Sequence, residues 1–151
     1  KNNFKKYIGL SWKSSAKFTN KKSLKINDFQ SIINEDDYGI INLQYGELND
    51  LEEFNLKNNN KIIKIDGLDE FNDLDSMISL IHCLDLVITS PNVNIHLAGS
   101  IGKKCLGFYH NSYESIFNSP TKNINEWYKN LKIVQFENDL KNKVEIEKKF
   151  L

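Results

Sequence analysis

The sequence contains no arginine, only two prolines and two cysteines, and no apolar run as long as a membrane-spanning helix. A helix needs about 18 consecutive apolar residues to span a bilayer, so no transmembrane segment is predicted. Its 20 lysines are balanced by 20 acidic residues, which leaves no net field to attract nucleic acid. Any site for an anion must therefore use lysine side chains, helix ends or backbone N–H groups.

Cys83 and Cys105 stand in apolar surroundings and lack the spacing of a metal site. We therefore expect buried free thiols and a reducing, cytoplasmic compartment. A chain of 151 residues can bury a full apolar core without disulfides or metals, so residues 1–151 are expected to form a single domain. Because the sequence begins KNNFKK without a methionine, we expect this domain to be part of a longer protein.

Short apolar runs alternate with helical patterns along the chain. The runs predict strands at residues 7–12, 39–43, 61–65, 86–89, 105–109 and 131–135. The helical patterns cover residues 27–34, 48–55, 73–84, 92–101 and 141–150. Most of the strands are apolar on both faces, which is typical of an α/β domain with a doubly wound parallel sheet of about six strands. Ligands of such sheets collect outside the carboxyl ends of the strands.

The stretch SPNVNIHLAG, residues 90–99, follows the predicted fourth strand. Ser90 is expected to be the N-cap of a helix, with Pro91 at the first helical position, where its missing N–H has no cost. The helix would then begin at the carboxyl edge of the sheet. Free N–H groups and the positive end of the helix dipole would form an anion site there without any charged side chain.

The spacing within this helix predicts two faces. Asn92, His96 and Gly99 recur at i, i+4 and i+7, so they would form a polar face able to hold a phosphate or a ribose. The adjoining apolar stripe, expected in the core, consists of Val93, Leu97 and Ile101. Spacing alone also allows a structural interpretation, in which His96 caps a neighbouring carbonyl and Gly99 packs on a strand.

Several alternative sites are excluded by their motifs. Neither GxxxxGK[ST] nor GxGxxG occurs, and there is no GxSxG hydrolase elbow. A phospho-receiver domain would need acids after the first strand to hold magnesium, but that loop reads WKSSAKFTNKKS and its basic character suits phosphate. The acids of DLD at 73–75 open a helix and complement its dipole, so no metal site is predicted.

The ordered set SWK, LQYG, DLD, DLVI and N followed by HLAG resembles the C-terminal domain of heptosyltransferase-like glycosyltransferases. It is most similar to those that follow tetratricopeptide repeats in bacterial proteins, over about residues 7–137. The resemblance implies a GT-B architecture, in which two Rossmann-like domains enclose the active site and the C-terminal one holds a nucleoside-diphosphate sugar. This chain would then be the C-terminal part of its protein. Its partner would be an N-terminal acceptor domain of the same protein, which normally carries the catalytic base.

By the same resemblance, the diphosphate of the donor would lie on the helix after the fourth strand, against His96 and the backbone of residues 92–94. The loop 13–23 would supply lysine and hydroxyl contacts, and Gln44 and Tyr45 would border the nucleotide. No metal and no cofactor besides the donor substrate is implied. The expected donor-binding residues are Lys13, Ser14, Lys22, Ser23, Gln44, Tyr45, Asn92, Val93, Asn94 and His96.

The sequence departs from the family pattern at three places. Ser90 and Pro91 replace the Asp that often ends the fourth strand, Asn94 stands where relatives have a small residue, and WYK at 127–129 replaces WYP. The expected function is donor binding within a hexosyl- or heptosyltransferase, with its catalytic residues unassigned and the isolated domain inactive. The alternative is a non-catalytic nucleotide-binding or protein-interaction module derived from the same fold.

Overall fold

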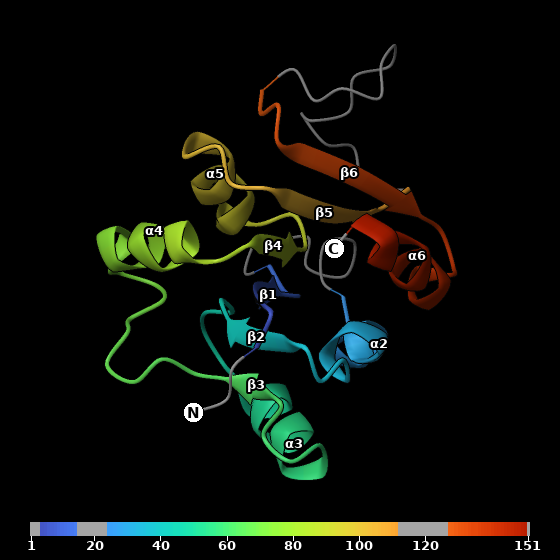
Figure 1. The fold of residues 1–151 in the computed structure, drawn as a ribbon, viewed down its shortest axis with the longest axis horizontal. Helices are drawn as coiled ribbons and strands as arrows, with labels where there is room; N and C mark the ends of the chain where they lie inside the picture. Colours follow the sequence, from blue (N-terminus) through green and yellow to red (C-terminus); the bar gives the residue numbers. More distant parts are fainter. Residues whose placement is uncertain (1–3, 15–23, 112–126, 151) are drawn as a thin grey trace.

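The computed structural model describes residues 4–14, 24–111 and 127–150. Within them, six strands form one sheet in which every neighbouring pair is parallel, in the order β3-β2-β1-β4-β5-β6 (Figure 1). The strands are β1 (Lys6–Ser11), β2 (Tyr38–Asn42), β3 (Ile62–Ile63), β4 (Leu86–Thr89), β5 (Cys105–His110) and β6 (Leu131–Phe136). The predicted doubly wound parallel sheet is thereby confirmed.

The edge strand β3 is shorter than predicted. The sequence pattern covers residues 61–65, but only Ile62 and Ile63 pair with β2. An edge strand has a partner on one side only, and the side chains of Lys64 and Asp66 are exposed beyond it. The chain therefore leaves the sheet early. The other five predicted strands agree with the structure to within one residue at each end.

The helices among the described residues also follow the predicted order. They are η1 (Ile26–Phe29), α2 (Gln30–Ile33), α3 (Asn49–Lys57), α4 (Leu74–Cys83), α5 (Val93–Ser100), α6 (Leu140–Glu147) and η2 (Lys148–Phe150). The helix predicted over 27–34 is divided into η1 and α2 at Phe29, whose φ of −98° and ψ of 8° depart from α-helical values. None of these helices combines the length and apolar character needed to cross a membrane.

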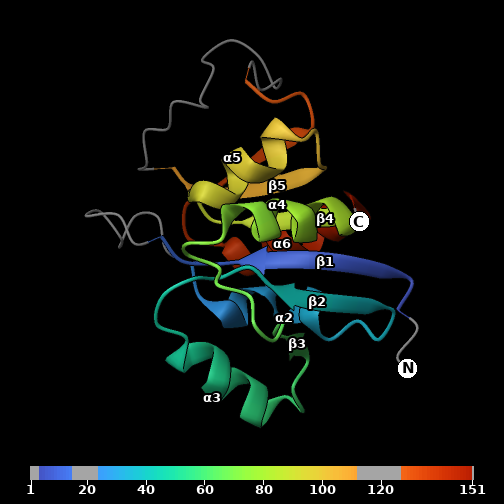
Figure 2. The same ribbon diagram turned by 90° about the vertical axis from the view of Figure 1, so that its left-hand side faces the viewer.

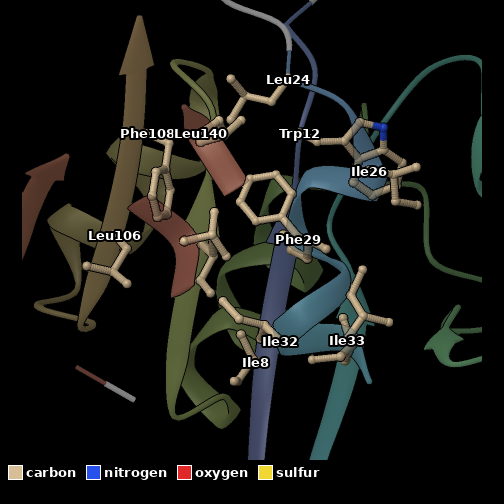
Figure 3. Packing of buried hydrophobic residues seen from close by; sticks show 14 of the residues in the cluster. Ile8, Trp12, Leu24, Ile26, Phe29, Ile32, Ile33, Leu106, Phe108 and Leu140 are labelled. Atoms are coloured by element: carbon tan, nitrogen blue, oxygen red, sulfur yellow. The ribbon is translucent and has the colours of Figure 1, made fainter. Parts of the chain in front are cut away.

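Helices cover both faces of the sheet and create two apolar cores. On one face, η1, α2, α3 and α6 pack around Phe29, whose ring meets that of Phe108 edge-on with centroids 5.7 Å apart. Figure 3 shows Phe29 in the middle of this cluster, between β1 and β5. On the other face, α4 and α5 pack on the sheet through residues such as Met77, Ile81 and Ile95. Burial of each strand on both faces explains why the strands are so apolar.

The carboxyl ends of the strands meet at one edge of the sheet. The chain enters β1 on the right of Figure 2, near the amino terminus, so the parallel strands end on the left. Ser11 at the end of β1 is level with Thr89 at the end of β4. The segments that follow β1, β2 and β4 therefore start side by side, and they contain most of the predicted site residues.

Candidate functional site

Helix α5 begins later than predicted, because Asn92 rather than Ser90 is its N-cap. Asn92 has an extended backbone, with φ of −142° and ψ of −173°, and its Oδ1 accepts a hydrogen bond from the N–H of Asn94 at 2.9 Å. Ser90 and Pro91 are buried in the bend before it. The hydroxyl oxygen of Ser90 accepts a hydrogen bond from Asn92 Nδ2 at 3.3 Å. Ser90 therefore supports the N-cap residue instead of being the N-cap itself.

Asn92 also joins this helix to the end of β1. Its Nδ2 donates to the Ser11 hydroxyl oxygen at 2.7 Å and to the carbonyl oxygen of Lys13 at 3.0 Å. The Thr89 hydroxyl donates to Asn92 Oδ1 at 3.0 Å. One side chain therefore connects β4, α5 and the loop after β1. These contacts hold the amino end of α5 at the carboxyl edge of the sheet.

Gln44 fixes the path of the chain after β1. Its Oε1 accepts three hydrogen bonds, from the Ser11 hydroxyl at 3.2 Å and from the backbone N–H groups of Trp12 and Lys13 at 3.0 Å and 2.7 Å. Its Nε2 donates to the carbonyl oxygen of Tyr45, and the residue is only 2% exposed. The side-chain amide of Gln44 thus makes its hydrogen bonds to other groups of the protein. Its predicted contact with a nucleotide stays a prediction.

The buried face of α5 differs from the predicted apolar stripe. Val93 is 38% exposed, whereas Asn94 is fully buried with Ile95 and Ala98. Asn94 is accommodated there because its Nδ2 donates to the carbonyl oxygen of Leu43 at 2.9 Å, although its Oδ1 has no partner among the described residues. The other two predicted stripe residues, half-buried beside this core, are Leu97 and Ile101.

Lys13 is paired with an acid that the sequence did not single out. Its Nζ lies 2.7 Å from Asp50 Oδ2, and the Trp12 indole N–H donates to the same oxygen at 2.7 Å. The charge of Lys13 is therefore compensated by Asp50. Ser14, which follows it, is 7% exposed. Lys22 and Ser23, the other residues expected in this loop, lie outside the described residues.

His96, Gly99 and Tyr128 form a compact cluster on α5. The Nδ1 of His96 lies 3.1 Å from the Tyr128 hydroxyl oxygen, and the two rings meet edge-on at an angle of 80°. A Cβ atom placed on Gly99 would lie 2.3 Å from Cγ of Tyr128. Gly99 therefore packs against an aromatic ring, and not on a strand as the structural interpretation supposed. His96 remains half-buried.

Two heptosyltransferases are among the solved structures that resemble this chain. One is the E. coli ADP-heptose lps heptosyltransferase II, with a TM-score of 0.63 and 16% identity over 97% of this chain. The other is the E. coli heptosyltransferase WaaC with ADP, with a TM-score of 0.66 and 13% identity over 99% of this chain. The chain has the fold of one GT-B domain. It spans 46% and 44% of the lengths of these two proteins.

The sequence itself gives no comparable match. No protein-family model matches it, and none of the curated proteins does. At such low identity the likeness to the two heptosyltransferases establishes the GT-B fold and leaves the activity of this chain to be argued from its own residues.

The loop after β3 adds Glu70 and Phe71 to the edge of this GT-B domain, and neither was among the expected donor-binding residues. Glu70 Oε1 accepts a hydrogen bond at 3.0 Å from Nδ2 of the buried Asn42. The next residue, Phe71, is 64% exposed, and its ring lies 5.8 Å from that of Tyr45. The rule that ligands collect at carboxyl ends selects this loop, which leaves the same edge, but no motif marks these two residues within it.

Proposed function

We propose that this GT-B domain holds the nucleoside diphosphate of a sugar donor at the carboxyl edge of its sheet. In the full-length protein it would be the C-terminal, donor-binding part of a glycosyltransferase, which moves the sugar to an acceptor held by an N-terminal domain. The observation that carries the proposal is the fold similarity over nearly the whole chain to two heptosyltransferases, one of them solved with ADP.

The amino end of α5 supports the proposed diphosphate site. Asn92 uses its side chain and carbonyl to accept from the N–H groups of Asn94 and Ile95, which leaves the N–H of Val93 without an acceptor among the described residues. A helix amino end favours negative charge through such N–H groups and its dipole. His96 lies one turn further along the helix. We assign the phosphate contacts to this end of α5 and to His96.

Lys13 would provide a cation for the leaving group. As the bond between the sugar and the diphosphate breaks, negative charge grows on the departing nucleoside diphosphate. A fixed positive charge lowers the energy of this transition state. The side chain of Lys13 is 39% exposed, and its ammonium group forms an ion pair with Asp50. A bound diphosphate would compete with Asp50 for this ammonium group. Lys22, Ser14 and Ser23 remain proposed contacts from the same loop.

Tyr45 and Phe71 would border the nucleobase. Stacking on aromatic rings binds any base through its π-face and is worth about 1–3 kcal/mol per base. Tyr45 follows Gln44 at the end of β2, and its carbonyl accepts from the Gln44 amide, so the backbone at this ring is held in place. The half-buried ring of Tyr45 and the exposed ring of Phe71 beside it would together form the platform for a base.

The test uses Val93 because a single change can delete its backbone N–H. Val93 is the first residue of α5, where proline is well tolerated, and the extended backbone of Asn92 before it suits a following proline. Val93→Pro should therefore fold normally. By losing one N–H donor to a charged phosphate, it should weaken ADP binding by roughly 10- to 100-fold. Val93→Ala keeps the N–H and should bind as the wild type does.

The binding measurement is isothermal titration calorimetry with ADP, GDP and UDP and their sugars, because the base is not assigned. His96→Ala provides a second variant, which should lose affinity while thermal melting shows a folded domain. Absence of binding by every nucleotide, or equal affinity for Val93→Pro and Val93→Ala, would contradict the proposed site. Sugar transfer by the full-length protein separates an enzyme from a non-catalytic nucleotide-binding module.

A further inference from the structure

Tyr128 joins the chain before β6 to the middle of α5. Its ring is half-buried against the core formed by α4 and α5, and its carbonyl oxygen accepts from the N–H of Leu131 at 3.1 Å. The ring occupies the space in which a side chain at Gly99 would stand. Its hydroxyl lies 3.1 Å from Nδ1 of His96. Packing alone would need the ring and the glycine, but would not need a hydroxyl at this distance from the imidazole.

This contact has a chemical consequence for His96. A neutral imidazole carries its proton on one nitrogen and accepts a hydrogen bond at the other. Either the Tyr128 hydroxyl donates to Nδ1, or a protonated Nδ1 donates to the hydroxyl oxygen. The greater basicity of the imidazole nitrogen favours the first arrangement. We propose that Tyr128 is a positioning residue, which holds His96 in the tautomer with its proton on Nε2.

The proposed tautomer gives His96 a donor for a phosphate oxygen. With Nδ1 engaged by Tyr128, the N–H group is on the opposite side of the ring, at Nε2. A neutral imidazole without such a partner would divide its proton between both nitrogens, whereas an imidazole held at Nδ1 keeps its N–H group at Nε2. The role toward phosphate rests on the proposed function, whereas the tautomer can be measured without any nucleotide.

Gly99 explains how the ring of Tyr128 reaches this position. His96 and Gly99 are three residues apart and therefore lie on the same face of α5. Because Gly99 has no side chain, the tyrosine ring can pack close to the helix at this position, within reach of the imidazole. His96 and Gly99 thus form a single contact surface for Tyr128. The spacing of the two residues in the sequence did not indicate this partner.

The experiment compares the wild type with Tyr128→Phe, which keeps the ring on Gly99 and removes only the hydroxyl. Imidazole nitrogens of the ¹⁵N-labelled domain are observed at about pH 8 by long-range proton–nitrogen correlation, which distinguishes the two tautomers. The His96 signal is assigned by its loss in His96→Gln. Wild type should show the proton of His96 on Nε2, and Tyr128→Phe should show a mixture. The exposed His82 provides an internal reference that should not change.

Affinity for ADP provides the second measurement. Tyr128→Phe should bind ADP about three- to tenfold more weakly than the wild type, as expected when one neutral hydrogen bond no longer orients a donor. Gly99→Ala, which displaces the ring, should change the tautomer in the same way. A conservative exchange that only loosened packing would lower the melting temperature without altering the tautomer.

Three results would overturn the proposal. Two concern the tautomer: a wild-type His96 with its proton on Nδ1, and a tautomer ratio that Tyr128→Phe leaves unchanged. The third is a changed tautomer with an unchanged affinity for ADP, which would remove the positioning role in binding. If the wild type binds no nucleotide, the proposed function fails together with the phosphate role, and the spectrum alone then decides the tautomer.

Discussion

The side-chain amide of Asn92 donates a hydrogen bond to the Ser11 hydroxyl oxygen at 2.7 Å, between residues 81 positions apart in the chain. The same side chain caps α5, so one residue both begins the helix and attaches it to β1. The amino end of α5 is thus held by tertiary contacts as well as by its own cap. This double role can be separated by substitution.

Asn92→Ser should be less destabilising than Asn92→Ala. Serine retains an oxygen that can cap the N–H of Asn94 but loses the amide donor to Ser11 and Lys13, whereas alanine loses both functions. A lost N-cap costs about 0.5–2 kcal/mol, so the two variants should differ by that amount in urea unfolding. Equal free energies of unfolding would show that the cap oxygen contributes nothing at this position.

Ile95→Ala should destabilise the domain far more than Val93→Ala. Ile95 is fully buried between α5 and the sheet, and truncation of such a side chain costs about 2–5 kcal/mol. Val93 is 38% exposed, so its truncation should change the free energy of unfolding by less than about 0.5 kcal/mol. Chemical denaturation measures both values. The reverse order would restore the apolar stripe predicted from the sequence.

Asp50→Asn should strengthen ADP binding by releasing Lys13. The asparagine can still accept from the Trp12 indole N–H, but it no longer neutralises the ammonium group. We expect a several-fold gain in affinity at low salt that declines as salt rises, because exposed charges are screened. Lys13→Ala is the matched control and should bind more weakly. Stability should change little in Lys13→Ala, since partly exposed ion pairs contribute about 0–1 kcal/mol.

Tyr45→Ala and Phe71→Ala should weaken binding of ADP but not of inorganic pyrophosphate, which has no base to stack. The comparison isolates the base from the phosphates on one protein. Loss of stacking should cost about 1–3 kcal/mol of binding free energy. Calorimetry with both ligands provides the measurement. A parallel loss for pyrophosphate would indicate a general disturbance of the edge and would argue against a base platform.

The stability of the domain should fall in acid partly because of Asp73. Hydrogen bonds from the side chain and backbone of Ser76 lower the pKa of Asp73 below its ordinary value of 3.8. A carboxyl with a lowered pKa in the folded state stabilises the protein above its unfolded pKa, and this contribution disappears as the pH falls through the folded pKa. Asp73→Asn still offers a cap oxygen without titrating. Its unfolding free energy, measured from pH 6 to pH 2, should depend less steeply on pH than that of the wild type.

The strands of the sheet could be predicted because each is encoded by an apolar run of a few consecutive residues. The run at 86–89, LVIT, consists of three apolar residues and a β-branched threonine, and the structure has β4 with the same bounds, fully buried. The start of α5 could not be predicted in this way. Ser90 and Asn92 are both good N-cap residues, and the choice depends on Ser11 and the carbonyl of Lys13, about 80 residues earlier. The capping propensities of residues 90 and 92 do not reflect a contact with so distant a part of the sequence.

The candidate site likewise combines features that local sequence indicates with features that depend on distant residues. Asn92 and His96 were selected from the sequence because they stand on one helix face, and Lys13 and Gln44 were selected through the family resemblance. Their partners, which include Asp50 and Tyr128, come from distant segments with no motif of their own. Sequence patterns therefore indicated the edge of the sheet, whereas the pairing of charges and the holding of His96 depend on the tertiary fold.

Gly99 and Tyr128 fill a single volume between them, and this limits how the two positions can evolve. A larger residue at position 99 alone collides with the ring, and a smaller residue at position 128 alone leaves a cavity beside α5. Each single step lowers fitness through stability, while a paired exchange of volume restores the packing. In descendants of this sequence the two positions should be inherited as one unit, even though they are 29 positions apart in the chain.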